Sequence, residues 1–221
     1  MRFFADRIEA GKRLASALSD FAGAKGVVLA IPRGGVVVGF EIARALSLFL
    51  DVIVPRKIGA PENPELAIGA VTEDGTMILD RDLIEYLEVS EAYIQKESEF
   101  QQSEIKRRIR LYRGNIGRIN LKNLDVIIVD DGIATGSTMK AALASVQKSG
   151  AKKVVIAVPV GPSSTIRELE NQADKVVCLY TPEPFNAIGE FYEDFSQTTD
   201  EEVKKLLKLA RQKGNGPRIG R

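Results

Sequence analysis

Five short apolar runs, separated by stretches with helical periodicity, are the feature that most restricts the fold of this chain. The runs span residues 26–31, 51–55, 124–130, 152–160 and 175–180. Nearly continuous apolar runs of this length are typical of parallel strands covered on both faces. The amphipathic segments are residues 6–21, 36–46, 137–148 and 163–171. We therefore expect an α/β fold with a parallel sheet, whose ligands bind at the carboxyl ends of the strands.

Two parts of the chain depart from this alternation. Residues 81–113 are rich in charge, and the part from residue 90 onward predicts one long helix with Ser90 as its N-cap. We expect a single domain over residues 1–221, with a helical insertion at about 81–120 and a C-terminal hood or tail at about 181–221. The tail carries an acid-capped sequence typical of a further helix, TTDEEVKKLLKLARQK.

The long helix has two interpretations. In the first, its basic end, KRRIRLYR, binds RNA or a protein partner, or the helix joins two copies of the chain in a homodimer. The simpler interpretation is a solvated helix with one packing stripe, which would consist of Tyr93, Ile94, Phe100, Ile105, Ile109 and Tyr112. Lysine and arginine number 31 against 30 acidic residues, so the net charge of +1 gives no reason to expect nucleic-acid binding.

Histidine is absent, and Cys178 is the single cysteine. This excludes Ser/His and Cys/His catalytic arrangements, histidine metal sites and a disulfide within the chain. Cys178 lies in an apolar run, and we interpret it as a buried strand residue. No apolar run reaches the length of a membrane span, so we expect a cytoplasmic protein that does not bind membranes.

The segment VDDGIATGST places two acids and a small hydroxyl-rich turn at the end of a predicted strand. The turn, Ala134–Thr135–Gly136–Ser137–Thr138, leads into a helix, whose first backbone N–H groups attract anions. Gly136 permits close approach of the backbone, and the hydroxyls add donors. Asp130 and Asp131 suit vicinal hydroxyls or a divalent cation. The alternative is plain helix capping, with the acids ending the strand.

Two further loops carry cationic residues at predicted strand ends. In PRGG, Gly34 and Gly35 can aim backbone N–H groups at an anion, and Arg33 offers a planar fork of donors. Arg56 and Lys57 follow the next strand and suit the charge of a polyphosphate. A structural turn for the first loop, and a solvated edge for the second, are the alternatives.

The segment at 126–138 resembles the signature of type I phosphoribosyltransferases, which bind 5-phosphoribosyl-1-pyrophosphate (PRPP): an apolar strand, two acids, three loose positions and Thr-Gly-x-Thr. The resemblance implies a Rossmann-like sheet of the type I phosphoribosyltransferase fold and covers roughly 26–180, interrupted by the insertion. It also implies that the turn holds the 5-phosphate and that Asp130 and Asp131 hold the ribose hydroxyls. PRGG is similar to the family's pyrophosphate loop, often built with a cis peptide.

Other segments are similar to the mobile and variable parts of such enzymes. Arg56 and Lys57 resemble the stretch that leads into a mobile lid, for which residues 58–68 are the candidate. TPEPFNAIGEFYEDF is similar to the acceptor-binding hood of purine-salvage members, with Phe185 stacking on the base and Tyr192 nearby; an aromatic cluster that packs the tail is the alternative. The whole layout looks like a poorly characterised branch that some bacteria fuse to a hydrolase domain.

The resemblance implies a Mg²⁺-dependent enzyme that transfers phosphoribosyl from PRPP to a nitrogenous acceptor, such as a nucleobase, and releases pyrophosphate. Its implied catalytic residues are Asp130, Asp131, Arg56 and Lys57, with the metal held mainly through PRPP. The alternative is a regulator that binds PRPP without transferring it, although all three PRPP elements are present. A PRPP-making kinase would need a nucleotide site, and none is evident.

Overall fold

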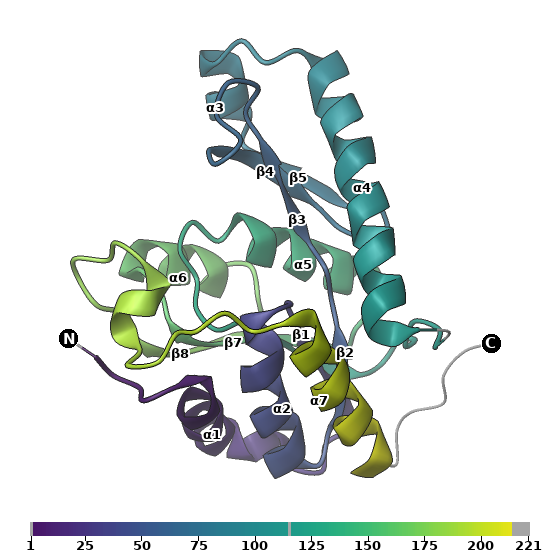
Figure 1. Cartoon of the computed structure of the whole chain (residues 1–221), viewed down its shortest axis with the longest axis vertical. Coiled ribbons are helices and arrows are strands. Elements are labelled where there is room, and N and C mark those ends of the chain that lie inside the picture. Colours follow the sequence, from purple (N-terminus) through teal and green to yellow (C-terminus); the bar gives the residue numbers. More distant parts are fainter. Residues whose placement is uncertain (1, 115, 214–221) are drawn as a thin grey trace.

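The computed structural model describes residues 2–114 and 116–213, in which two sheets and the helices around them form the fold (Figure 1). The strands are β1 (Gly26–Ala30), β2 (Phe49–Val52), β3 (Arg56–Gly59), β4 (Ala67–Val71), β5 (Met77–Leu79), β6 (Asp125–Val129), β7 (Lys153–Val160) and β8 (Lys175–Tyr180). The α-helices are α1 (Arg7–Ala17), α2 (Gly34–Leu46), α3 (Arg81–Tyr86), α4 (Glu91–Arg113), α5 (Ser137–Lys148), α6 (Ser163–Glu170) and α7 (Asp200–Lys213). Short 3-10 helices span Ser19–Phe21 and Ile188–Phe191.

The central sheet has the strand order β2-β1-β6-β7-β8, and every neighbouring pair is parallel. This confirms the predicted parallel α/β fold. Successive residues of a strand point to opposite faces, and two separate apolar layers result. Val28 and Ile127 belong to one layer, whereas Val27 and Ile128 belong to the other. Because both layers are buried, the strands carry the continuous apolar runs seen in the sequence.

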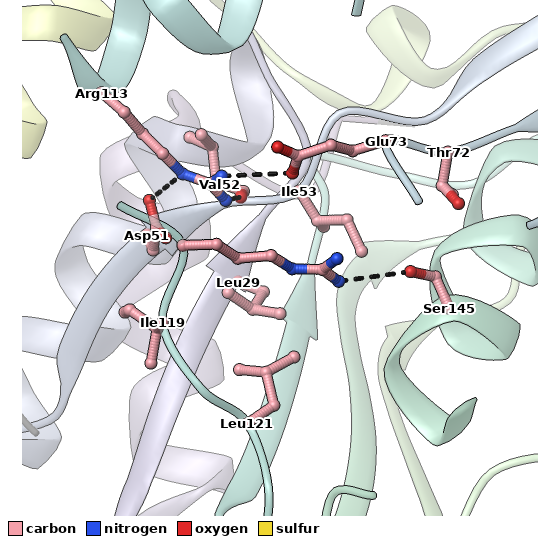
Figure 2. Close-up of a pocket in the computed structure, with 11 residues that line it drawn as sticks. Leu29, Asp51, Val52, Ile53, Thr72, Glu73, Arg113, Ile119, Leu121 and Ser145 are labelled. Atoms are coloured by element: carbon pink, nitrogen blue, oxygen red, sulfur yellow. Dashed lines mark hydrogen bonds and ion pairs between the residues drawn. The ribbon is translucent and has the colours of Figure 1, made fainter. Parts of the chain in front are cut away.

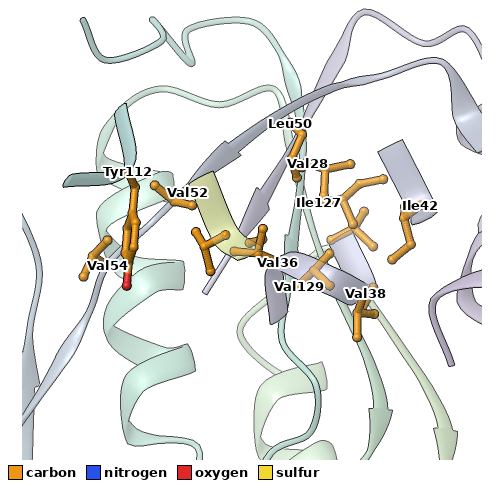
Figure 3. Packing of buried hydrophobic residues seen from close by; sticks show 14 of the residues in the cluster. Val28, Val36, Val38, Ile42, Leu50, Val52, Val54, Tyr112, Ile127 and Val129 are labelled. Atoms are coloured by element: carbon orange, nitrogen blue, oxygen red, sulfur yellow. The ribbon is translucent and has the colours of Figure 1, made fainter. Parts of the chain in front are cut away.

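Helices cover both faces of this sheet. On one face α2 packs against α1, α7 and β1, and Val36, Val38 and Ile42 of α2 join the layer shown in Figure 3. On the other face α5 and α6 contribute residues such as Met139, Leu143 and Leu169. The carboxyl ends of β1 and β6 therefore meet at one edge of the sheet, where the loops that lead into α2 and α5 begin.

A second unit stands on this edge and is made of the antiparallel sheet β3-β4-β5 with α3 and α4 (Figure 1). The sequence patterns predicted its long helix α4 within a helical insertion, but not α3 as a separate helix and none of the strands β3, β4 and β5. The segment at 58–68, expected to form a lid, includes the ends of β3 and β4 and the connection 60–66. Residues 61–66 of that connection are all exposed.

Helix α4 confirms the predicted long helix, and the Ser90 hydroxyl accepts a hydrogen bond from the backbone N–H of Tyr93 at 3.3 Å. Its expected packing stripe is largely buried, with Ile94, Ile105 and Tyr112 in the core. Phe100 is the exception, because its side chain is 57% exposed and the expected stripe is wrong at this position. The helix therefore packs on the rest of the protein along one side, through Ile94, Ile105 and Tyr112, while Phe100 faces away from the core.

The C-terminal end of α4 is fixed to the central sheet by a buried arginine (Figure 2). Arg113 donates to Asp51 at 3.0 Å and to the carbonyl oxygen of Val52 at 2.6 Å, and it contacts Glu73 at 3.2 Å. The residues around it enclose a cavity of only about 10 Å³. Close packing at this junction holds α4 over the sheet edge.

The C-terminal part begins with the loop after β8 and continues through Ile188–Phe191 to α7. Helix α7 packs on α2 and β2 and begins beside the carboxyl edge of the sheet. The last part of the tail predicted at 181–221 lies outside the described residues. Within the described ranges, no helix is both long enough and apolar enough to span a bilayer.

Candidate active site

The acid pair lies immediately after β6, at the carboxyl edge of the central sheet. Asp130 is partly buried, and one of its carboxylate oxygens accepts a hydrogen bond from the backbone N–H of Asp131 at 2.8 Å. Burial of the carboxylate, reinforced by the charge of Asp131, raises the pKa of Asp130 well above its ordinary value. The site thus holds two adjacent carboxyl groups, and the Asp130 carboxyl is less acidic than an ordinary aspartate.

The carboxylate of Asp131 is held by Arg7, a residue that the sequence patterns did not single out. The Nε of Arg7, in α1, donates to its carboxylate at 2.7 Å, and both side chains are largely buried. The same guanidinium donates to the carbonyl oxygen of Ser196 and lies 3.9 Å from the ring centre of Phe195. No local pattern marks Arg7, because its partner is 124 positions away in the chain. Only the packing of α1 brings the two together.

The glycine pair of PRGG packs directly against the acid pair. A Cβ atom added to Gly34 would lie 1.9 Å from a carboxylate oxygen of Asp131, and one added to Gly35 would lie 2.9 Å from the Cα of Asp130. Only glycine permits this approach. The peptide bond between Pro32 and Arg33 is cis. The first loop and the acid pair therefore form one continuous wall at the ends of β1 and β6.

The hydroxyl-rich turn leads from the acid pair into α5. Gly136 has a φ of +79° and serves as the N-cap, so the first helical N–H groups face outward beside Ser137 and Thr138. The hydroxyls of Thr135 and Ser137 lie 3.3 Å apart. Thr165 donates to the carbonyl oxygen of Ala134 at 3.0 Å, which fixes the turn from behind. This geometry suits a phosphate group.

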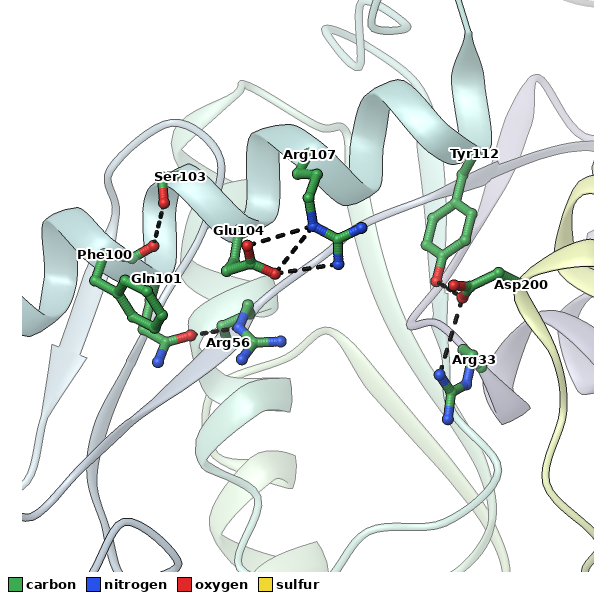
Figure 4. Close-up of polar contacts among 9 residues, drawn as sticks. All are labelled: Arg33, Arg56, Phe100, Gln101, Ser103, Glu104, Arg107, Tyr112 and Asp200. Carbon is green, nitrogen blue, oxygen red and sulfur yellow. Dashed lines mark hydrogen bonds and ion pairs between the residues drawn. The ribbon is translucent and has the colours of Figure 1, made fainter.

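Arg56 and Lys57 are neighbours in sequence, but β3 places them on opposite faces, as strand alternation requires. Arg56 points to α4, where its Nε donates to Gln101 (Figure 4). Lys57 forms an ion pair with Glu65 of the connection 60–66 at 2.7 Å. Burial, and then the charge of Arg108, lowers the pKa of Arg56. The structure places Arg56 against α4 and leaves Lys57 with the connection 60–66.

The two aromatic residues expected to bind an acceptor differ in exposure. Phe185 is partly buried, and its ring centre is 5.0 Å from that of Phe191. Tyr192 is 2% exposed, and its hydroxyl donates to the carbonyl oxygen of Asp131 at 2.6 Å. Tyr192 therefore supports the acid pair from behind instead of facing an open pocket. Cys178 is half-buried, and burial raises its thiol pKa to about 11, so it is a poor nucleophile.

The comparisons with known proteins agree with this arrangement. A family model described as phosphoribosyl transferase domain matches residues 5–195. The chain belongs to the phosphoribosyl transferase family. Two relatives from strains of Mycobacterium tuberculosis, MT0597 and Rv0571c, each named "Putative phosphoribosyl transferase", are 45% identical over 210 residues. The match covers 95% of this chain and 47% of each relative, so the chain spans about half of their length.

A solved structure shares the fold along nearly the whole chain. The crystal structure of TT1426 from Thermus thermophilus is 43% identical, has a TM-score of 0.79, and is matched over 94% of this chain and 98% of its own. The likeness therefore extends over both the central sheet and the unit of β3–β5, α3 and α4. The fold expected from the PRPP-type signature is confirmed.

Phosphoribosyl transferases of this family generally use Mg²⁺, and the residues of this site offer a partial set of ligands. In the described part of the chain, no three His, Cys, Asp or Glu residues gather into a metal site. Asp131 is already engaged by Arg7, and Asp130 accepts a backbone N–H. The two acids can complete the shell of an ion that is carried by phosphate oxygens, as is usual for Mg²⁺, but they do not form a cage themselves.

A cleft of about 460 Å³ lies behind the phosphate-type turn, between α5 and the strand β5. Its lining includes Ser137, Lys140, Asp80 and Arg81. Lys140 is paired with Glu168 at 2.6 Å, so this lysine already has an acidic partner. It touches the turn only through Ser137 and lies apart from the acid pair.

Proposed function

We propose that the chain transfers the 5-phosphoribosyl group of PRPP to a nitrogenous acceptor, a nucleobase in the first instance, with release of pyrophosphate. The observation that carries the proposal is the meeting of three elements at one sheet edge. These are the acid pair, the PRGG loop that touches it, and the turn at the start of α5. Membership in the phosphoribosyl transferase family supports the reaction class.

Each element has a role in this proposal. The turn from Ala134 to Thr138 binds the 5-phosphate through the N–H groups at the start of α5. Asp130 and Asp131 accept hydrogen bonds from the two ribose hydroxyls, and Arg7 with Tyr192 fixes their position. The wall at Gly34 and Gly35 brings backbone N–H groups to the diphosphate.

Positively charged side chains stabilise the pyrophosphate as it leaves. As the bond at C1 of the ribose breaks, negative charge grows on the leaving diphosphate, and Arg33 and Arg56 stabilise it. Lys57 is paired with Glu65 of the connection 60–66, and it reaches the site only if that connection closes. Mg²⁺ bound with the diphosphate would supply further positive charge. The proton of the acceptor passes to a carboxylate or to the leaving group, because the chain has no histidine.

The test is release of pyrophosphate from PRPP with Mg²⁺, measured across purine, pyrimidine and other nitrogen acceptors. Release with one acceptor class supports the transferase and names its substrate. Binding of PRPP in calorimetry without release under any acceptor would instead support a regulator that senses PRPP. Absence of PRPP binding would overturn both functions.

A paired substitution tests the acid pair itself. Asp130→Asn with Asp131→Asn removes both charges but keeps similar shapes, so we expect PRPP binding to be lost while the circular dichroism spectrum is unchanged. Ser103→Ala, on the outer side of α4, is the control and should bind PRPP normally. Normal binding by the paired variant would contradict the proposed role of the acids.

A further inference from the structure

One side of α4 lies between Arg56 and Arg33, two cations of the candidate site (Figure 4). We call it the inner face of α4; it consists of Gln101, Glu104, Arg108 and Tyr112, which follow one another at helical spacing. At one end Gln101 accepts a hydrogen bond from Arg56. At the other end the Tyr112 hydroxyl donates to Asp200 at 2.6 Å.

Arg33 lies beneath the second end of this face. Its guanidinium is 3.9 Å from the same Asp200 oxygen that accepts from Tyr112. The inner face of α4 therefore spans the distance from Arg56 to Arg33, the two arginines assigned to the diphosphate. Arg108 stands between the two ends, one helical turn from Tyr112 and two turns from Gln101.

Arg108 is partly buried, and its charge acts on the groups at both ends. It lowers the pKa of Arg56 and opposes the rise in the pKa of Tyr112. In the parts of the chain that the structure describes, no carboxylate lies within ion-pair distance of Arg108 or Arg56. The nearby Glu104 is paired with Arg107 at 3.1 Å.

Arg33, Arg56 and Arg108 are partly buried on this side of α4, whereas the Arg107 side chain is 59% exposed. The nearby carboxylates already have other partners: Glu97 accepts from Gln101 at 2.6 Å, Glu104 pairs with Arg107, and Asp200 accepts from Tyr112. An anion that joins the partly buried guanidinium groups would therefore stabilise them, and planar guanidinium groups bind phosphate oxygens in pairs.

We propose that α4 supplies a third arginine to the diphosphate of the sugar substrate, and that Arg108 binds this diphosphate together with Arg33 and Arg56. The inference rests on the proposed function and assigns α4 a place in the substrate site. It explains why the unit of β3–β5, α3 and α4 stands on the carboxyl edge of the sheet. Arg108 contacts the leaving group in this assignment and does not contact the ribose 5-phosphate.

The experiment compares three probes in calorimetry with Mg²⁺: PRPP, inorganic pyrophosphate and ribose 5-phosphate. The variant is Arg108→Gln, and the control is Arg110→Gln, which removes the same charge from an exposed position on the same helix. We expect Arg108→Gln to weaken the binding of PRPP and of pyrophosphate at least about tenfold. Its affinity for ribose 5-phosphate should be unchanged, and Arg110→Gln should bind all three probes as the wild type does.

Arg108→Lys keeps the positive charge but loses the paired N–H donors of the guanidinium group. Its affinity for pyrophosphate should therefore lie between those of the wild type and Arg108→Gln. Equal affinities of Arg108→Gln and the wild type for pyrophosphate would overturn the inference alone. Equal losses for pyrophosphate and ribose 5-phosphate would overturn it too, since they indicate a general structural effect. Failure of the wild type to bind either PRPP or ribose 5-phosphate would overturn the proposed function as well.

Discussion

Gly34 illustrates how single residues decide the shape of this site. Its missing side chain leaves room for the carboxylate of Asp131 and the guanidinium of Arg7, which would lie 1.9 and 2.6 Å from an added Cβ. The acid pair, the PRGG loop and α1 are therefore in contact at one residue. Adding one methyl group at Gly34 would therefore displace parts of all three.

Gly34→Ala should displace Asp131 or Arg7 from its present position. A misplacement of about 1 Å in a positioned site can cost on the order of 100-fold in activity, and we expect a loss of that order in kcat/KM for pyrophosphate release. Thermal unfolding of the variant serves as the control for folding. A folded Gly34→Ala protein with normal kcat/KM would contradict the contact.

Asp130 is the second residue whose surroundings have a measurable consequence. Its pKa is raised in the folded state, chiefly by burial, so ionising it costs folding free energy. This group adds stability below its unfolded pKa of about 4, and the contribution is lost as the pH rises through the folded value. The native state is therefore less stable near neutral pH than in acid, as far as this group is concerned.

Asp130→Asn should consequently unfold at a higher temperature than the wild type at neutral pH. We expect a rise in Tm of about 2–4 °C, the change that 1 kcal/mol gives in a domain of this size. The difference should disappear in acid, where both side chains are neutral. Asp20→Asn, at a carboxylate that is 82% exposed, should show neither effect. A lower Tm for Asp130→Asn at neutral pH would refute the direction of the shift.

At the scale of elements, α4 is placed by its C-terminal end. Arg113 is 5% exposed and Asp51 is 2% exposed, and the pair joins the last turn of α4 to β2. Breaking such a pair leaves a charge buried without its partner, which usually costs more than the intact pair contributes. The position of the inner face of α4 therefore depends on this junction.

Arg113→Met should lower the free energy of unfolding by about 3–5 kcal/mol, because Asp51 remains buried and unpaired. Urea unfolding of Arg113→Met, Asp51→Asn and the double variant gives the coupling between the two side chains. We expect the double variant to be more stable than Arg113→Met. Arg110→Met, on the exposed side of the same helix, should stay within about 0.5 kcal/mol of the wild type. Additive losses would show that the two residues act independently.

At the scale of the whole molecule, the unit of β3–β5, α3 and α4 meets the central sheet at the site. The connection 60–66 between β3 and β4 is exposed at residues 61–66, and Lys57 is tied to it through Glu65. The expected lid at 58–68 stays a prediction. Closure over a bound sugar phosphate would bring Lys57 inward and exclude water.

Limited proteolysis by a glutamate-specific protease tests this movement. We expect cleavage at Glu62 and Glu65 in the free protein and at least about fivefold slower cleavage with PRPP and Mg²⁺, because bound ligand stabilises the closed form. Cleavage after Glu85 and Glu88, near α3, is the internal control and should change little. Unchanged cleavage at Glu62 under saturating PRPP would argue against a lid.

The sequence alone determined the central sheet, the long helix and the acid pair with its turn, because each depends on neighbours in the chain. A continuous apolar run, a Ser90 cap or a strand–acid–turn segment is a local pattern that burial and helix geometry impose. Tertiary structure alone decided which distant groups complete the site. Arg7 meets Asp131 across 124 positions, and Tyr192 supports it across 61. Pairing with β4 makes the segment of Arg56 and Lys57 a strand, β3. Neighbouring side chains of a strand point to opposite faces, so only the tertiary structure separates these two cations.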